Sequence, residues 1–174
     1  YRIMDYYNKT IILTGMMGSG KTTIGRNLAS RLNLSFEDSD QYFVNATGHS
    51  IPEIFKRFGE KYFRDAEERI IKTIILEKRN KVLSVGGGAF INEKLRNFII
   101  NNSTSIWLDA SFKTLFNRLK NNTKNRPLFE GYNFEDRLKH ILKERTKYYK
   151  LAHIRVNVNN KLIPEIIDKI LEYI

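Results

Sequence analysis

The chain alternates short runs of mostly apolar residues with longer segments in which apolar residues recur every three or four positions. The short runs cover Lys9–Thr14, Lys81–Val85, Ser105–Asp109 and Ile154–Val158, and Ser35–Glu37 could be a further, brief strand. Short apolar runs of this kind are typical of parallel strands that are buried on both faces. The pattern therefore predicts five strands.

Helical spacing is found in the segments between these runs. Ser50-Ile51-Pro52-Glu53 has the form of a capping box with proline in the first turn, which predicts a helix from there to about Phe58. A second helix is expected directly after it, because its apolar residues share one helical face. These residues are Phe63, Ala66, Ile70, Ile71, Ile74 and Ile75.

Four further helices are expected along the chain. The first follows the first apolar run, and the second follows Ser111. The third covers Glu135–Tyr149, and the last begins near Pro164. Strands that alternate with helices predict a three-layer α/β sandwich, in which helices flank a parallel sheet on both faces. Asp38–Asp40 is interpreted as an acidic turn and Asn121–Asn133 as a loop.

The 174 residues suffice for one domain, and no linker, internal repeat or low-complexity segment divides them. Cysteine is absent, which excludes disulfides, cysteine-ligated zinc and thiol catalysis. No apolar run approaches the roughly 18–20 residues of a membrane span, and no charged-then-apolar leader opens the chain. A soluble, cytoplasmic protein with no membrane partner is therefore expected.

The formal net charge of +11 is the one unusual feature of the composition. Residues 113–155 hold 12 of the 30 basic side chains but only 4 of the 19 acidic ones. A segment that binds a polyanion fits this concentration, and so does a lid over a phosphorylated ligand. Charge alone leaves both kinds of partner open.

Gly15–Thr22, with the sequence GMMGSGKT, matches the phosphate-binding pattern G-x-x-x-x-G-K-[ST] between a predicted strand and a predicted helix. Glycines allow backbone N–H groups to surround phosphate oxygens, and the helix directs its positive end at the same anion. Lys21 is expected to reach the β- and γ-phosphates, and the Thr22 hydroxyl to ligate Mg²⁺. The motif predicts a fold of the P-loop NTPase type.

A P-loop alone does not separate a GTPase, a motor ATPase and a small-molecule kinase. The chain has no N-K-x-D tetrapeptide for guanine recognition, and a motor usually needs a longer chain. The acidic partner of Mg²⁺ often ends an adjacent strand, but Lys81–Val85 is followed by glycines. Asp38 is the nearest candidate; Asp109 is a rival that is better interpreted as a helix N-cap.

Asp38 and Asp40 stand one residue apart, so two carboxylates could divide the work at a site. One could hold a metal-bound water while the other accepts a hydrogen bond from a substrate hydroxyl. Taken alone, an acidic turn that caps the next helix is the simpler interpretation. Gly86–Gly88 follows a predicted buried strand, which is where ligands bind in open α/β sheets.

Three arginines have the chemistry to hold a carboxylate or a phosphate. Arg64 lies beside the apolar stripe of its helix, Arg126 precedes a proline in the loop, and Arg145 lies in the basic helix. The alternative for Arg64 is a surface ion pair with Glu67 or Glu68.

In combination, these motifs resemble the shikimate kinase family. The resemblance runs from about Ile11 to Val158 and is carried, in order, by GMMGSGKTTIGRNLA, FEDSD, TGHSIPEIF, GEKYFRDAE, VLSVGGG, NRPLF and ERTKYY. It implies a fold like that of the nucleoside monophosphate kinases, with a five-stranded parallel sheet. It also implies transfer of phosphate from ATP to the 3-hydroxyl of shikimate, a step toward chorismate and the aromatic amino acids.

The resemblance implies a single kinase domain over residues 1–174, acting as a monomer. An acceptor-binding insert would cover about 38–66 and a lid about 119–134. The implied ATP-binding residues are Gly18, Ser19, Gly20, Lys21, Thr22, Thr23, Arg118 and Arg126. The implied acceptor-binding residues are Asp40, Arg64, Gly86, Gly87, Gly88 and Arg145.

Catalysis would depend on Lys21, on Asp40 as the candidate base, and on Arg126 from the lid. Mg²⁺ would be held by Thr22 and, through water, by Asp38. Glu67 would support Arg64, Arg118 would lie along the adenine, and the loop near Asn159 would close the base pocket. The chain departs from the family pattern after Arg145, where an expected proline is missing.

Two other classes remain as alternatives. Gluconate kinases and nucleoside monophosphate kinases share the P-loop, but the glycine run and two carboxylate-binding arginines argue against both. An ATPase that binds RNA or DNA would use stacking aromatics along its charged groove. Phe129, Tyr132 and Phe134 lie outside the densest charge, so no nucleic-acid partner is expected.

Overall fold

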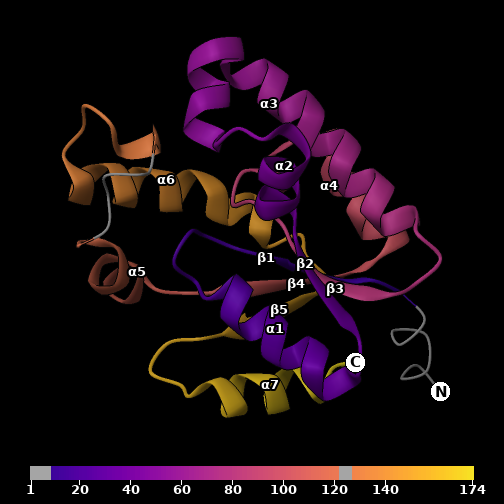
Figure 1. The fold of residues 1–174 in the computed structure, drawn as a ribbon. Helices are drawn as coiled ribbons and strands as arrows, with labels where there is room; N and C mark the ends of the chain where they lie inside the picture. Colours follow the sequence, from indigo (N-terminus) through magenta and orange to yellow (C-terminus); the bar gives the residue numbers. More distant parts are fainter. Residues whose placement is uncertain (1–8, 122–126) are drawn as a thin grey trace.

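The computed structural model describes residues 9–121 and 127–174 (Figure 1). Its strands form one sheet in the order β2-β3-β1-β4-β5, and each of the four neighbouring pairs is parallel. The strands are β1 (Ile11–Thr14), β2 (Ser35–Asp38), β3 (Lys81–Ser84), β4 (Thr104–Asp109) and β5 (Ile154–Asn157). The prediction of five parallel strands is confirmed.

The central strands are apolar because both of their faces are covered. β1 and β3 are buried at every residue, whereas buried and exposed residues alternate along the edge strand β5. Leu13 of β1 is level with Ser84 of β3 and Ile106 of β4. The carboxyl ends of these strands therefore reach the same edge of the sheet.

Helices cover the sheet on both faces, which makes the three predicted layers (Figure 1). α1 (Lys21–Leu32) and α7 (Ile163–Leu171) lie on one face. α3 (Ile51–Leu76), α4 (Glu93–Asn102) and α6 (Phe134–Tyr149) lie on the other, with α5 (Phe112–Leu119) beside α6. The described residues include no helix that is long and apolar enough to cross a membrane.

The local signals for helix ends are confirmed. Ser50 and Glu53 form the predicted capping box at the start of α3, and Ser111 caps α5 by accepting a hydrogen bond from the Thr114 amide. Gly59 has φ 83° and ψ 170°, so α3 consists of two helical segments joined by a bend. This matches the two successive helices that the sequence predicts.

Two helices were not predicted. The interpretation of Asp38–Asp40 as a turn is wrong, because α2 (Ser39–Thr47) begins inside it. α2 buries only Ser39 and Phe43, which leaves too little apolar periodicity to reveal a helix. α4 was missed as well. The predicted loop Asn121–Asn133 contains a short 3₁₀ helix, η2 (Pro127–Phe129), and a second one, η1 (Ala89–Ile91), follows the glycine run.

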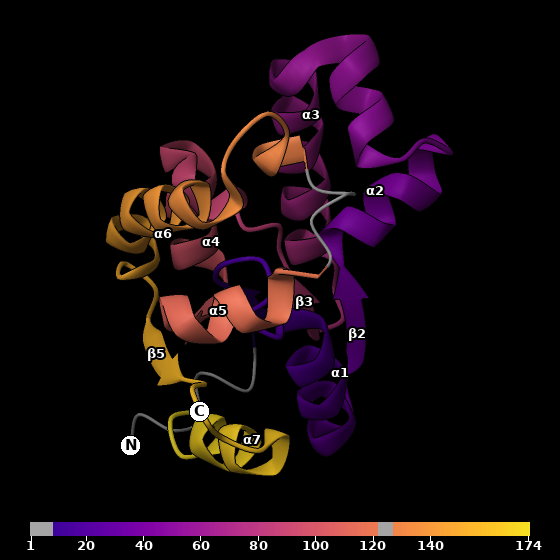
Figure 2. The same cartoon turned by 90° about the vertical axis from the view of Figure 1, so that its left-hand side faces the viewer.

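A small apolar cluster holds α2 against α3. It consists of Phe43, Ile54 and Phe63, with the rings of Phe43 and Phe63 packed edge to face at 5.2 Å. α2 and α3 extend past the carboxyl end of β2, on the side of the molecule where the segment with η2 lies (Figure 2). This cluster therefore positions a second layer of residues above the phosphate-binding loop.

Candidate active site

The phosphate-binding loop connects β1 to α1 at the centre of the sheet. Gly15, Gly18 and Gly20 have φ values of 144°, 79° and 98°, a backbone region that residues other than glycine rarely adopt. Gly20 is also the N-cap of α1, and the first turn of this helix contains no acidic residue. The positive end of the helix dipole therefore faces the loop without local compensation.

Lys21 folds back over the loop. Its Nζ atom donates to the carbonyl oxygens of Gly15 and Met16 at 2.9 and 3.0 Å. A cavity of about 290 Å³ lies beside it. The predicted ATP-binding residues that line this cavity are Gly18, Gly20, Lys21, Thr22 and Thr23. Ser19, within the same loop, is buried, and its amide donates to the Met16 carbonyl oxygen at 3.1 Å.

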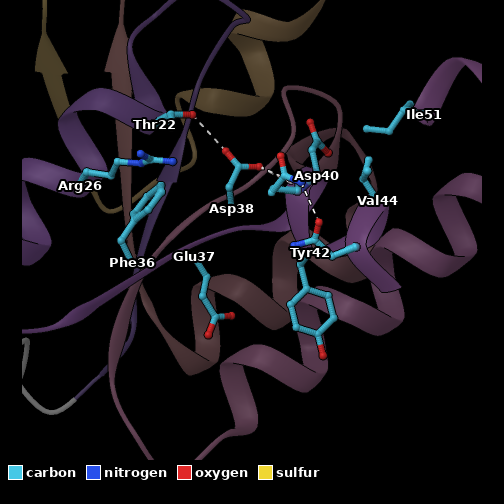
Figure 3. Close-up of a pocket in the computed structure, with 11 residues that line it drawn as sticks. Thr22, Arg26, Phe36, Glu37, Asp38, Asp40, Tyr42, Val44 and Ile51 are labelled. Carbon is cyan, nitrogen blue, oxygen red and sulfur yellow. Dashed lines mark hydrogen bonds between the residues drawn. The ribbon is translucent and has the colours of Figure 1, made fainter. Parts of the chain in front are cut away.

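Asp38 uses its two carboxylate oxygens differently (Figure 3). Oδ1 accepts the amides of Asp40 and Gln41 at 3.0 and 3.3 Å and so caps α2. Oδ2 accepts the Thr22 hydroxyl at 3.0 Å. The capping role that the sequence suggested and the link to the P-loop threonine are therefore both present in one side chain.

Asp40 lies in the first turn of α2 and faces the glycine run. Burial raises the pKa of its carboxyl, and the neighbouring charge of Asp38 acts in the same direction. The positive charges of Lys21 and Arg64 oppose this increase. A carboxylate that is pushed toward neutrality is a better proton acceptor than an ordinary exposed aspartate.

Arg64 and Glu67 form a largely buried ion pair on α3. Arg64 Nη1 donates to Glu67 Oε2 at 2.8 Å, and the Glu67 side chain is only 4% exposed. Burial raises the pKa of Glu67, and Arg64 opposes the increase. The alternative of a surface ion pair for Arg64 is therefore wrong, although the partner is the expected one.

Each glycine of the run Gly86–Gly88 makes room for a different charged group. A Cβ on Gly86 would lie 2.8 Å from Glu67 Oε1 and 3.0 Å from Asp40 Oδ1. On Gly87 it would lie 3.0 Å from Arg145 Nη1, and on Gly88 it would lie 2.5 Å from Arg64 Nη2. The absence of side chains in the run therefore allows the carboxylates and guanidinium groups to pack directly against its backbone.

A cavity of about 200 Å³ collects the predicted acceptor-binding residues. Asp40, Arg64, Gly86, Gly88 and Arg145 line it, and the Arg145 residue is only 7% exposed. Gly87 lies directly behind, in contact range of Arg145. Although Arg145 lies in the basic helix α6, its side chain is therefore buried at the site and not solvated.

The apolar wall of this cavity was missed at the sequence level. It consists of Met17, Ile51, Pro52, Phe55, Phe63 and Leu128. These residues come from the P-loop, α3 and η2, so no local spacing relates them. Ser39 was also missed: its buried hydroxyl accepts the Gly86 amide at 3.3 Å and ties α2 to the glycine run.

A third cavity, of about 360 Å³, lies on the far side of the P-loop, between α5 and the segment before α7. Arg118 lines it and donates from Nη1 to the Gly18 carbonyl at 2.9 Å. The Asn159 side chain accepts the Ser111 amide and the Thr114 hydroxyl at 2.7 and 2.8 Å. The loop near Asn159 is thereby held against α5, at the edge of the cavity.

Two predicted residues fall elsewhere. Arg126 lies outside the described residues. Asp109 is not the N-cap of α5, because Ser111 takes that position. The Asp109 carboxylate instead accepts two hydrogen bonds from Arg155, at 2.6 and 2.9 Å, so its charge is already paired and Asp38 is the better partner for a metal ion.

Comparison with known proteins agrees with this geometry. The family model described as shikimate kinase matches residues 17–174. A shikimate kinase of Zymomonas mobilis is 43% identical over 165 residues, which cover 95% of this chain and 93% of that protein. A shikimate kinase of Sulfurihydrogenibium is 39% identical over 94% of this chain and 96% of its own length.

Solved structures give the same result. The shikimate kinase of Acinetobacter baumannii, in complex with shikimate, superposes with a TM-score of 0.86 at 34% identity, covering 95% of this chain and 92% of that one. A gluconokinase of Sinorhizobium meliloti has a TM-score of 0.63 at 17% identity over 95% and 91% of the two chains, a likeness of fold alone. The chain belongs to the shikimate kinase family.

Proposed function

We propose that this chain transfers the γ-phosphoryl group of ATP to the 3-hydroxyl of shikimate, giving shikimate 3-phosphate and ADP. One observation carries the proposal: Asp40 lines both the cavity over the P-loop and the cavity between Arg64 and Arg145. A carboxylate in that position can accept a proton from an acceptor hydroxyl while the hydroxyl faces a phosphate.

The acceptor cavity has the chemistry for a small ring that carries one carboxylate and several hydroxyls. Arg64 and Arg145 offer guanidinium groups, which suit a carboxylate better than a neutral sugar. The apolar wall around Phe55 and Phe63 matches the face of a carbon ring, and Asp40 can accept from its hydroxyls. Gluconate has no carbon ring to pack against this wall, and a nucleoside monophosphate is much larger than shikimate.

The nucleotide is proposed to occupy the cavity over the P-loop and the cavity beside Arg118. Backbone N–H groups of Gly18–Thr23 and the Lys21 ammonium group would hold the phosphates. Arg118 would lie along the base, with the loop near Asn159 closing that pocket. Arg126 would approach the transferring phosphoryl group from the lid.

Thr22 and Asp38 fit a magnesium site. Their hydroxyl and carboxylate oxygens lie 3.0 Å apart beside the phosphate cavity, and Mg²⁺ is commonly bound by one or two such groups together with phosphate oxygens and water. The described residues contain no cluster of three or more His, Cys, Asp or Glu side chains that could hold a metal by themselves. A bound Mg²⁺ would neutralise the charge that develops on the phosphate oxygens.

The chain itself would mainly position the reactants. Asp40 orients the acceptor hydroxyl in line with the γ-phosphorus and receives its proton as the new P–O bond forms. The bond between the γ-phosphorus and the β–γ bridging oxygen breaks, and ADP leaves with that electron pair. Lys21 and Arg126 stabilise the equatorial oxygens, which carry most of the charge in a largely dissociative transition state.

The domain organisation is part of the proposal. α2 and the first segment of α3 would form the acceptor-binding insert, over about 38–66, and residues of about 119–134 the lid. Leu128 of η2 already lines the acceptor cavity. With the acceptor and nucleotide cavities lined by one chain, a monomer would be sufficient for activity.

A coupled ADP-release assay tests this function. With MgATP, we expect acceptor-dependent release with shikimate and far slower release with quinate, gluconate or nucleoside monophosphates. Addition of a polyanion such as heparin or poly(U) should not replace the acceptor. Absence of shikimate-dependent release would overturn the proposal.

A further inference from the structure

Tyr149 is a buried polar residue that none of the proposed steps uses. It is the last residue of α6, one helical turn after Arg145, so both side chains lie on the same face of the helix. Tyr149 has no exposed surface, and its ring packs against Trp107 of β4 with the centroids 6.1 Å apart. A tyrosine hydroxyl buried this completely is stable only when it is hydrogen-bonded.

The Tyr149 hydroxyl joins three parts of the site. It donates to the Gly87 carbonyl at 2.5 Å. The Arg145 guanidinium lies on the same side of Gly87 and lowers the pKa of this hydroxyl through its charge and hydrogen bonding. Met16 Sδ of the P-loop lies 3.8 Å away. The hydroxyl has one proton, and a carbonyl oxygen is a stronger acceptor than a thioether, so Gly87 receives it.

The neighbours of Gly87 show how tight this junction is. A Cβ on Gly87 would lie 3.0 Å from Arg145 Nη1, 3.3 Å from the Gly15 carbonyl and 3.5 Å from the Tyr149 hydroxyl. The glycine run, the start of the P-loop and the two α6 side chains therefore meet at one residue.

The Tyr149 hydroxyl is a donor at neutral pH, and burial extends this to alkaline pH. Loss of hydration raises the pKa of Tyr149 to about 12, although the positive charge of Arg145 and its hydrogen bond act in the opposite direction. The proton is therefore available for the Gly87 carbonyl throughout the pH range in which kinases are assayed. The guanidinium group has no lone pair to offer and remains a donor.

We propose that Tyr149 is a positioning residue for the acceptor: its hydroxyl holds Arg145 at the acceptor cavity and holds Gly86–Gly88 against the P-loop. The inference rests on the proposed function, since it assigns Arg145 to the acceptor. Tyr149 acts only through Arg145 and Gly87, because it does not line the acceptor cavity. A purely structural role would be limited to the packing of its ring on Trp107.

Tyr149→Phe separates the two roles, because it keeps the ring and removes only the hydroxyl. We expect the KM for shikimate to rise about tenfold, the KM for ATP to change less than twofold, and kcat to fall less than the KM rises. A tyrosine that matters only for the packing of its ring would leave both KM values and the thermal midpoint close to those of the wild type. An unchanged KM for shikimate would overturn the proposal.

Tyr148→Phe is the matched control. Tyr148 precedes Tyr149 on the same helix, and its ring faces the Arg96 guanidinium at 5.2 Å. Removal of its hydroxyl is expected to leave the KM for shikimate within twofold of the wild type. A KM increase equal to that of Tyr149→Phe would overturn the assignment to the Tyr149 hydroxyl.

A double-mutant cycle tests the route through Arg145. In an Arg145→Ala background, Tyr149→Phe should raise the KM for shikimate by less than threefold, because the side chain that the Tyr149 hydroxyl positions is absent. Full additivity would overturn the positioning role. Failure of the proposed function gives a different result: the wild type itself would then show no shikimate-dependent ADP release, whereas failure of this inference leaves the wild type active and Tyr149→Phe normal.

Discussion

The nucleotide side and the acceptor side of this site are built in different ways. The P-loop comes from one continuous stretch, Gly15–Thr22, whose shape depends on backbone dihedral angles that only glycine adopts readily. The acceptor cavity is assembled from several separate segments of the chain, namely α2, α3, the glycine run and α6. Its shape depends on charged side chains that lock one another in place.

This difference separates two kinds of sensitivity. On the nucleotide side, a substitution changes a group that would itself contact the phosphates. On the acceptor side, a change at one residue displaces another, as Gly88 and Arg64 illustrate. Asp40 belongs to both cavities, so its substitution should have the largest effect.

Asp40→Asn removes the proposed base and keeps the size of the side chain. We expect kcat to fall about 10³-fold, in the range of general-base catalysis, while the dissociation constant for MgATP changes less than threefold. Steady-state kinetics and calorimetric titration with a nonhydrolysable ATP analogue measure the two quantities. Full turnover in this variant would contradict the assignment of the base.

Asp38→Asn tests the metal on the nucleotide side without disturbing α2. Asparagine caps helices as well as aspartate does, so the thermal midpoint should stay within about 2 °C, whereas loss of the carboxylate charge should lower kcat about 10²-fold at limiting Mg²⁺. Activity is measured across a Mg²⁺ titration.

Asp38→Ala is the control for the cap. It should lose activity to a similar extent and also lower the midpoint by about 2–4 °C, because about 1 kcal/mol of capping is lost. If Asp38→Asn needed no more Mg²⁺ than the wild type, the metal role would be wrong.

Gly88→Ala probes the acceptor side through sterics. Its φ of −93° suits alanine, but the new Cβ would lie 2.5–2.7 Å from the Arg64 guanidinium. Because the end of an arginine side chain moves easily, stability should change little. The displaced Arg64 should raise the KM for shikimate about 30-fold, the same effect that we expect of Arg64→Ala, with the KM for ATP changing far less.

The double variant checks the cause. Gly88→Ala added to Arg64→Ala should raise the KM no further, because the side chain that it displaces is absent. Equal effects on the KM values of shikimate and ATP would contradict a role on the acceptor side.

The pH profile should show the smallest effect. Burial, then the charge of Asp38, raises the pKa of Asp40, against the opposing charges of Lys21 and Arg64. Because the base works as a carboxylate, kcat/KM for shikimate should fall as the pH falls through this raised pKa, above the range of an ordinary aspartate. Arg64→Ala removes an opposing positive charge and should move this acid limb further upward. An acid limb that moves downward would contradict the electrostatic argument.

Much of the nucleotide side could be predicted because its signals are local. The strands, the P-loop and the capping residues Ser50 and Ser111 depend on neighbours a few positions away. The acceptor residues Asp40 and Arg64 were candidates from their chemistry, but only the family resemblance favoured a functional role over the simpler interpretation. Taken by themselves, they look like an acidic turn and a surface ion pair.

The rest could not be predicted, since it depends on contacts between distant segments. α2 has too few buried residues to show a helical stripe. Phe55 and Leu128 share a cavity wall but belong to α3 and η2. Asp109 looked like a helix cap until its pairing with Arg155 of the neighbouring strand was visible.

By itself, the sequence determined the alternation of strands and helices, the phosphate-binding loop and the family, because each depends on short-range spacing. Only the tertiary structure decided what the glycine run does. Gly86 leaves space for Asp40 and Glu67, Gly87 for Arg145, and Gly88 for Arg64. The Tyr149 hydroxyl donates a hydrogen bond to the Gly87 carbonyl. Steric room is a property of the neighbours that packing supplies, and those neighbours come from α2, α3 and α6.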